Sequence, residues 1–314
     1  MSDRGRLALV ALLLAMALAP RVGSSQAAPP TLAELGVELP TLGGAKWWSI
    51  TQRSYVNATT LRDIRENLHA SYVRTGWIPG RLVFEKFRWR REDNGMDTIC
   101  GSGLRVMMLV PSPKDDGKGL TDLVDNIREF FARYTAREPG CIQYAEMCNE
   151  ADLRSNGFAD VHAYAAFYAR VAPVIAAYGI PIITSGVSGE DRPWTATLAT
   201  ILKQAKPNVP VAGYGFHPYG VPPVAMADAV LAMRQAAGAL PSGHLPDVFV
   251  TEIGEADAKS LYATIVNLAH VTPTITLYEY LAQPGEDARY GLKNNPALYQ
   301  AVQAAWEELH ASRP

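Results

Sequence analysis

The stretch that decides the fold is IQYAEMCNEAD, residues 142–152. It begins as a short apolar run and ends in Asn149 and Glu150, with Asp152 two positions further on. An apolar run of this length is typical of a strand that is buried on both faces of a parallel sheet. The polar residues at its end mark the edge of that sheet.

Seven other short apolar runs are spaced along the chain, and segments with apolar residues at helical spacing separate them. We therefore predict an α/β fold, a (β/α)8 TIM barrel, because eight strand and helix units fit the length of residues 28–314. An open doubly wound sheet is the alternative, although no glycine-rich nucleotide-binding loop follows any run. The other runs are Gly36–Pro40, Ser71–Trp77, Leu104–Pro111, Ile180–Gly186, Val211–Tyr219, Val248–Gly254 and Thr274–Leu281.

Three helices are signalled clearly by their boundary residues. One begins near Thr121 and Asp122, a second spans Asp160 to Gly179, and a third follows Asn295. Residues 77–101 are expected to form a long loop.

The N-terminus has the three-part layout of a secretory signal. Arg4 and Arg6 precede an apolar run, Leu7–Ala19, and small residues follow up to Ala27. We predict a signal peptide over residues 1–27 and a single domain over residues 28–314, secreted or periplasmic in a bacterium, with no stable membrane insertion after cleavage. A retained N-terminal anchor is the alternative.

Charge and cysteine content limit the partners. The chain has 29 Lys and Arg against 31 Asp and Glu, a balance that excludes a broad field for nucleic acid. Cys100 and Cys141 lie at the bottom of adjacent predicted strands, so we predict a disulfide between them and leave Cys148 as a buried thiol. Three reduced core cysteines are the alternative. The cysteines lack metal-ligand spacing, so no metal or organic cofactor is expected.

In a (β/α)8 barrel, functional residues lie at the carboxyl ends of the strands. Several predicted runs end in polar residues of this kind, and the second run carries a buried-looking arginine. These residues are Arg74, Asn149, Glu150, His217, Tyr219, Thr251 and Glu252.

Strand alternation sorts the acids further, because residues two apart face the same side. Glu150 and Glu252 are the last acids of their runs and are predicted to emerge at the mouth of the barrel. Glu146 and Cys148 share the face of Glu150, and the deeper Glu146 is predicted to pair with Arg74.

Two strand-end carboxylates are the equipment for glycoside hydrolysis. One protonates the leaving oxygen, and the other attacks the anomeric carbon or activates water. Asp152 and Glu255 lie beyond the strand ends, where we expect solvated surface positions.

Four motifs together resemble the clan of retaining (β/α)8 glycoside hydrolases that includes families 5 and 39. The resemblance covers most of the chain from Gly36 onward. The eighth run and its sequel are similar to family 39-like members. The motifs are NE at 149–150, HPY at 217–219, TEIG at 251–254 and LYEYLAQPGEDARYGL at 277–292.

The resemblance implies roles for these residues. Glu150 would be the acid/base, Glu252 the nucleophile, and Asn149 a partner of the sugar 2-hydroxyl, with the two carboxyls about 5 Å apart. Arg74 and Tyr219 would stabilise the charged form of Glu252. The histidine at position 217 would orient the acid/base, bind a hydroxyl, or only complete a hydrogen-bond network.

Aromatic side chains at the mouth are candidate sugar platforms. Many clan members carry a Trp at the end of strand eight, where this chain offers Tyr278 or Tyr280, and a Trp before the Asn-Glu pair, where this chain has Cys148. Each tryptophan candidate could equally pack against the barrel. The tryptophan candidates are Trp47, Trp48, Trp77 and Trp194.

The sequence therefore predicts a monomeric, secreted, retaining glycoside hydrolase that cleaves within a β-linked polysaccharide or oligosaccharide. A transglycosylase and a non-catalytic glycan-binding protein on the same fold are the alternatives. A metal-dependent hydrolase is disfavoured, because no His and Asp ligands cluster at the strand ends.

Overall fold

Short strands and longer helices alternate along the chain in the computed structural model, which describes residues 32–39, 56–76, 89–116, 120–240, 242–282 and 289–311. All of these residues fall in one compact unit, residues 32–314. The predicted signal, residues 1–27, lies outside the described residues.

Within the described residues, nine strands form one parallel sheet in the order β5-β4-β3-β2-β1-β9-β8-β7-β6. Each of the eight predicted apolar runs overlaps a strand; β1 begins two residues before the first run, and β6 follows directly after the fifth. The strands are β1 (Glu34–Glu38), β2 (Tyr72–Gly76), β3 (Arg105–Val110), β4 (Ile142–Met147), β5 (Ile182–Ile183), β6 (Val187–Ser188), β7 (Tyr214–His217), β8 (Val248–Ile253) and β9 (Thr274–Leu277).

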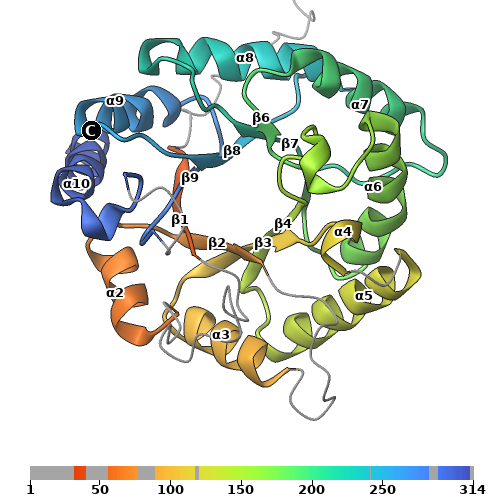
Figure 1. Ribbon diagram of the computed structural model, residues 1–314, viewed down its shortest axis with the longest axis horizontal. Coiled ribbons are helices and arrows are strands. Elements are labelled where there is room, and N and C mark those ends of the chain that lie inside the picture. Colours follow the sequence, from red (N-terminus) through yellow and green to blue (C-terminus); the bar gives the residue numbers. More distant parts are fainter. Residues whose placement is uncertain are drawn as a thin grey trace, which may run out of the picture. The chain divides into compact units, whose positions relative to one another are not determined.

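The sheet closes into a ring where its two end strands, β5 and β6, meet. β5 pairs with β4 and β6 pairs with β7, while Ile183 of β5 also bridges to Gly213 just before β7. Figure 1 shows the strands as a ring with the helices outside it. This arrangement confirms the predicted (β/α)8 barrel.

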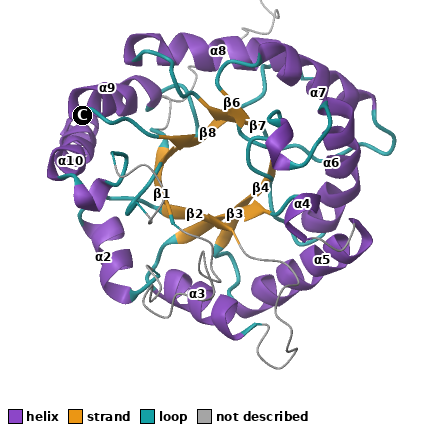
Figure 2. Cartoon of the chain, viewed as in Figure 1, coloured by secondary structure: helices purple, strands orange, loops and turns teal. Residues whose placement is uncertain are grey.

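The helices form the outer layer, which Figure 2 separates by colour from the strands. The predicted loop over residues 77–101 is wrong in its second half, because residues 90–101 are helical. The helices are α2 (Ala58–Glu66), α3 (Arg90–Gly101), α4 (Pro113–Asp116), α5 (Leu120–Arg137), α6 (Val161–Ala176), α7 (Arg192–Gln204), α8 (Met226–Ala237), α9 (Ala258–Leu268) and α10 (Pro296–Ala311), with 3-10 turns at Arg154–Asn156, Pro223–Ala225 and Leu292–Asn294.

Several helices begin where a side chain accepts a backbone N–H of the first turn. Asn57 accepts from Thr60 before α2, and Asp160 accepts from Ala163 at the start of α6. Such caps satisfy amide groups that have no partner within the helix. The predicted start of α6 is therefore confirmed.

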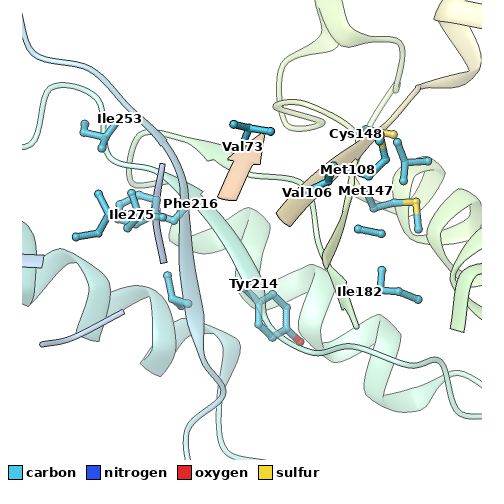
Figure 3. Packing of buried hydrophobic residues seen from close by; sticks show 14 of the residues in the cluster. Val73, Val106, Met108, Met147, Cys148, Ile182, Tyr214, Phe216, Ile253 and Ile275 are labelled. Carbon is cyan, nitrogen blue, oxygen red and sulfur yellow. The ribbon is translucent and has the colours of Figure 1, made fainter. Parts of the chain in front are cut away.

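The core has two parts. A large cluster fills the space between strands and helices, and Figure 3 shows members such as Val73, Met108 and Phe216 within it. A small cluster that includes Tyr72 and Phe249 fills the barrel below the strand ends. The packed interior makes the carboxyl ends of the strands the place where side chains can meet a substrate.

The disulfide prediction is confirmed. Cys100 at the end of α3 is bonded to Cys141, which directly precedes β4, with Cα atoms 5.7 Å apart. Cys148 is buried, and its sulfur lies 3.7 Å from the carbonyl oxygen of Pro111. None of the helices in the described segments has the length and hydrophobicity needed to cross a membrane.

Candidate active site

Arg74 of β2 is the centre of the site, and its side chain is only 1% exposed. Its Nε and Nη2 donate to Glu146 at 2.6 and 3.3 Å, and Nη2 also donates to Asn149 Oδ1 at 2.6 Å. Its Nη1 donates to Glu252 Oε2 at 2.7 Å and to Glu38 Oε2 at 2.5 Å. One guanidinium of β2 thus gathers side chains from β1, from β8, and from β4 and the residues just after it.

Glu146 lies at the bottom of the site and is fully buried. Besides its pair with Arg74, it accepts from Thr251 Oγ1 at 2.9 Å and from the backbone N–H of Gly186 at 3.1 Å. Burial alone would raise its pKa, but Arg74 and His217 outweigh burial and lower the pKa to about 2. The predicted pairing of Glu146 with Arg74 is confirmed.

Glu252, near the end of β8, is held as a carboxylate. Oε2 accepts from Arg74, and Oε1 accepts from the hydroxyl of Tyr219 at 2.9 Å. Burial would raise the pKa of Glu252, but the charges of His217 and Arg74 and the Tyr219 hydrogen bond outweigh it and lower the pKa. Its side chain is 10% exposed, so an ionised carboxylate is available at the mouth of the barrel.

His217, the last residue of β7, lies between the two predicted catalytic carboxyls. Its Nδ1 is 3.3 Å from Glu150 Oε1 and 4.0 Å from Glu252 Oε2, and its Nε2 is 3.1 Å from Thr251 Oγ1. Burial opposes the charged ring, but Glu252 and hydrogen bonds to Glu146 and Glu150 overcome this and raise the pKa to about 9. The ring is therefore an imidazolium at neutral pH.

Glu150 is carried by a backbone that has left the strand. β4 ends at Met147, and the φ angles of Cys148 and Glu150 are 70° and 40°, in the left-handed region that non-glycine residues seldom adopt. The Glu150 carbonyl accepts from Leu153 N–H at 3.0 Å and from Asn156 Nδ2 at 3.1 Å. These bonds hold the strained turn in place.

This turn overturns one prediction. Cys148 was expected to share the face of Glu146 and Glu150, but it packs in the large cluster between strands and helices (Figure 3). The two-residue alternation stops where the strand stops, so it does not extend past Met147.

The two predicted catalytic carboxyls converge on one nitrogen. Glu150 Oε1 and Glu252 Oε2 lie 3.3 and 4.0 Å from His217 Nδ1, so the sum of the two distances, 7.3 Å, is the upper limit of their separation. Their side chains are 18% and 10% exposed. Both carboxyls are therefore partly exposed to solvent at the carboxyl ends of the strands.

Asn149 offers a donor to a substrate. Its Oδ1 must be the atom that faces Arg74, because a guanidinium can only donate. The Nδ2 amide group is thereby turned away from Arg74, and the residue is half-buried. A hydroxyl oxygen beside Glu252 would be a suitable acceptor for it.

Two acids of the site were not recognised in the sequence. Glu38 ends β1 and is bonded to Arg74, and burial together with the charge of Glu252 raises its pKa to about 8 against the opposing charge of Arg74. A polar residue at the end of the first strand was the available signal. Asp152, expected at a solvated surface, is half-buried instead and accepts Ser188 N–H at 3.2 Å, and burial raises its pKa to about 6.

The predicted aromatic platforms lie in different surroundings. Trp194, on the first turn of α7, is half-buried with its ring 5.2 Å from that of Tyr164. Tyr278 is half-buried with its ring 6.2 Å from that of Tyr290, whereas Tyr280 is buried and donates its hydroxyl to a carboxylate on α2. Tyr280 is therefore directed away from the barrel mouth.

Three predicted platforms, Trp47, Trp48 and Trp77, lie outside the described residues. Among the residues that the structure does describe, no group of three or more His, Cys, Asp or Glu is arranged to hold a metal ion.

The sequence matches no family model and no curated protein. The fold is similar to that of solved glycosidases. A GH5_18 protein from Streptomyces cattleya, solved in complex with GlcNAc, is 14% identical with a TM-score of 0.63, over 91% of this chain and 82% of that one. An endo-1,4-β-mannanase from Rhizomucor miehei is 10% identical with a TM-score of 0.56, over 90% and 99%.

A GH128 endo-β-1,3-glucanase from Amycolatopsis mediterranei, in complex with laminaritriose, is 14% identical with a TM-score of 0.53, over 87% of this chain and 99% of that one. At such identities the likeness concerns the fold.

Proposed function

We propose that this protein is a retaining glycoside hydrolase that cleaves within a β-linked polysaccharide, with Glu150 as acid/base and Glu252 as nucleophile. One observation carries the proposal. An ionised carboxylate held by Arg74 and Tyr219 lies at most 7.3 Å from a second carboxyl, across a charged His217. The fold shared with an endo-mannanase and an endo-glucanase supports the substrate class.

In the first step, a Glu252 oxygen attacks the anomeric carbon while the glycosidic C–O bond breaks, and the leaving oxygen takes the proton of Glu150. In the second step, Glu150 accepts a proton from water, and the water oxygen displaces Glu252 from the sugar. Glu150 Oε1 and Glu252 Oε2 lie at most 7.3 Å apart, and direct attack is proposed because Arg74 and Tyr219 hold Glu252 as a carboxylate.

His217 orients the carboxyl group of its neighbour Glu150. As an imidazolium, its Nδ1–H donates to Glu150 Oε1, and its Nε2–H donates to Thr251, whose hydroxyl donates to Glu146. Because Oε1 accepts this proton, the acidic proton of Glu150 belongs on the other oxygen. The Asn149 amide would bind the sugar 2-hydroxyl, a contact that strengthens in the transition state.

The same proposal includes a secretory signal over residues 1–27 and a mature domain over residues 28–314 that acts as a monomer outside the cytoplasm. The Cys100–Cys141 disulfide supports an oxidising compartment.

The test is reducing-end release from a panel of β-glucans, mannans, xylans and galactans. Glu150→Gln and Glu252→Gln should each lower the rate by about 10²-fold or more. Glu255→Gln is the matched control. Glu255 lies three residues beyond Glu252 and accepts a hydrogen bond from Thr264 rather than from Arg74 or His217. NMR of the first product should show the β-anomer.

Silence across the panel, or activity that survives both changes, would overturn the proposal. Products longer than the substrate would indicate a transglycosylase, which uses the same residues. Binding without cleavage would indicate a glycan-binding protein.

A further inference from the structure

Glu38 and Glu252 share one nitrogen. Arg74 Nη1 lies 2.5 Å from Glu38 Oε2 and 2.7 Å from Glu252 Oε2, so the two carboxyl oxygens are within 5.2 Å of each other, the sum of these distances. The register of the sheet places Glu38 directly beside Arg74. The Glu38 side chain is 20% exposed, so protons can exchange with solvent.

The charges of this cluster balance without Glu38. Arg74 and His217 are the two cations, and Glu146 and Glu252 are carboxylates that contact them. Glu150, which also contacts His217, is not counted because it is the proposed acid. A third anion on the same guanidinium would face Glu252 with no cation of its own. Burial and the charge of Glu252 accordingly raise the pKa of Glu38 to about 8.

The groups around Glu38 come from every neighbouring element. Arg74 faces it from β2, Glu252 from β8 and His217 from β7, and Tyr219 lies beyond the end of β7. Beyond β9, the backbone N–H of Tyr280 donates to the backbone carbonyl of Glu38, and Glu279, the residue before Tyr280, is buried. Esterification would remove the charge of only one of these groups, Glu252.

We propose that Glu38 is a positioning residue that exchanges its ionisation state with Glu252 during the reaction. It is a carboxylic acid while Glu252 is a free carboxylate, and it becomes the carboxylate partner of Arg74 while Glu252 is esterified to the sugar. This inference rests on the proposed function for its second half only.

The proton balance is complete. When the Glu252 oxygen bonds to the anomeric carbon, the electron pair of the glycosidic bond goes to the leaving oxygen, which takes the Glu150 proton, and Glu38 releases its own proton to solvent. When water displaces Glu252, Glu150 regains a proton from that water, the electron pair of the ester bond returns to Glu252, and Glu38 takes a proton from solvent. Arg74 thus keeps two carboxylate partners throughout, Glu146 with Glu252 in the free enzyme and Glu146 with Glu38 in the glycosyl-enzyme.

The test needs no substrate. Carboxyl-labelled glutamate allows the titration of Glu38 to be followed by ¹³C NMR, with the resonance assigned by its loss in Glu38→Gln. In the wild type the midpoint should lie near pH 8. Glu252→Gln imitates the neutral, esterified nucleophile, and should lower that midpoint by about one pH unit or more.

Glu150→Gln is the control, because Glu150 contacts His217 but not Arg74, and it should leave the midpoint nearly unchanged. A wild-type midpoint near 4.5, or a midpoint that stays near 8 in Glu252→Gln, would overturn the inference. If Glu252→Gln does not fold, the inference is tested by the Glu38 titration midpoints of the wild type and of Glu252→Ala. If the protein were inactive on every glycan, the Glu38 titration would still give the same result. If the titration contradicted the inference, the proposed hydrolase function would not be affected.

Discussion

Replacement of Glu38 by glutamine should make the protein more stable at alkaline pH. In the unfolded chain Glu38 ionises near its ordinary value of 4.5, whereas in the folded protein its pKa is about 8. Between these values the folded state binds a proton that the unfolded state has released. Stability therefore falls as pH rises through this window, and the wild type loses it at about 1.36 kcal/mol per pH unit.

The magnitude follows from the width of the window. From pH 4.5 to about pH 8 the loss amounts to about 4 to 5 kcal/mol. Glutamine has no proton to release, and its amide oxygen can still accept from Arg74 Nη1. The Glu38→Gln variant should thus match the wild type near pH 4.5 and exceed its free energy of unfolding by about 4 kcal/mol at pH 8.

Urea unfolding, followed by circular dichroism at each pH unit from 5 to 9, measures this difference directly. Other titrating groups are present in both proteins, so their contributions largely cancel in the comparison. Glu66→Gln, on α2 where the side chain is 50% exposed, is the matched control for a surface substitution of the same kind. A gap that does not widen between pH 5 and pH 8, or a variant less stable than the wild type at pH 8, would refute the reasoning.

Three other predictions concern separate parts of the structure. Replacing Cys100 and Cys141 by serine releases a loop of 41 residues and should lower the free energy of unfolding by about 4 kcal/mol, with a loss under about 1 kcal/mol contradicting the pairing. Tyr219→Phe removes a hydrogen bond to the proposed nucleophile, so kcat/KM should fall about 10- to 100-fold and the acidic limb of its pH profile should move to higher pH; an unchanged limb would count against that contact. Gly186→Ala would place a methyl group against the imidazole between the two carboxyls and should cost about 1 to 3 kcal/mol, whereas Gly101→Ala, with open space, should not.

The fold could be predicted from the sequence because buried parallel strands are continuous in hydrophobicity, and each of the eight runs overlaps one. Strand ends could not be predicted as well. The strand in the fourth run ends at Met147 because Cys148 and Glu150 turn into the left-handed region, and a hydrogen bond from Asn156 in the following loop holds that turn. Such contacts are invisible to local periodicity.

Side-chain partners were predictable only where alternation within a strand was enough. Glu146 and Arg74 were paired correctly, because each lies within its strand and faces the barrel interior. Asp152 was misplaced, because its carboxylate is half-buried by a contact with Ser188 on β6, a segment 36 residues further along the chain. The sequence does not disclose that the two segments meet.

Glu38 shows why a list of acids does not by itself identify their roles. Its contact with Arg74 depends on the register between β1 and β2, and register in a barrel is set by the stagger of the closed sheet rather than by either strand. Its protonation depends on a count of charges around Arg74, to which β4, β7 and β8 each contribute. A carboxyl further from Glu252 and more exposed to solvent would have a pKa closer to its ordinary value, because Coulomb interactions weaken with distance and with solvent exposure. Geometry therefore converts an unremarkable strand-end glutamate into a group whose charge follows that of the proposed nucleophile.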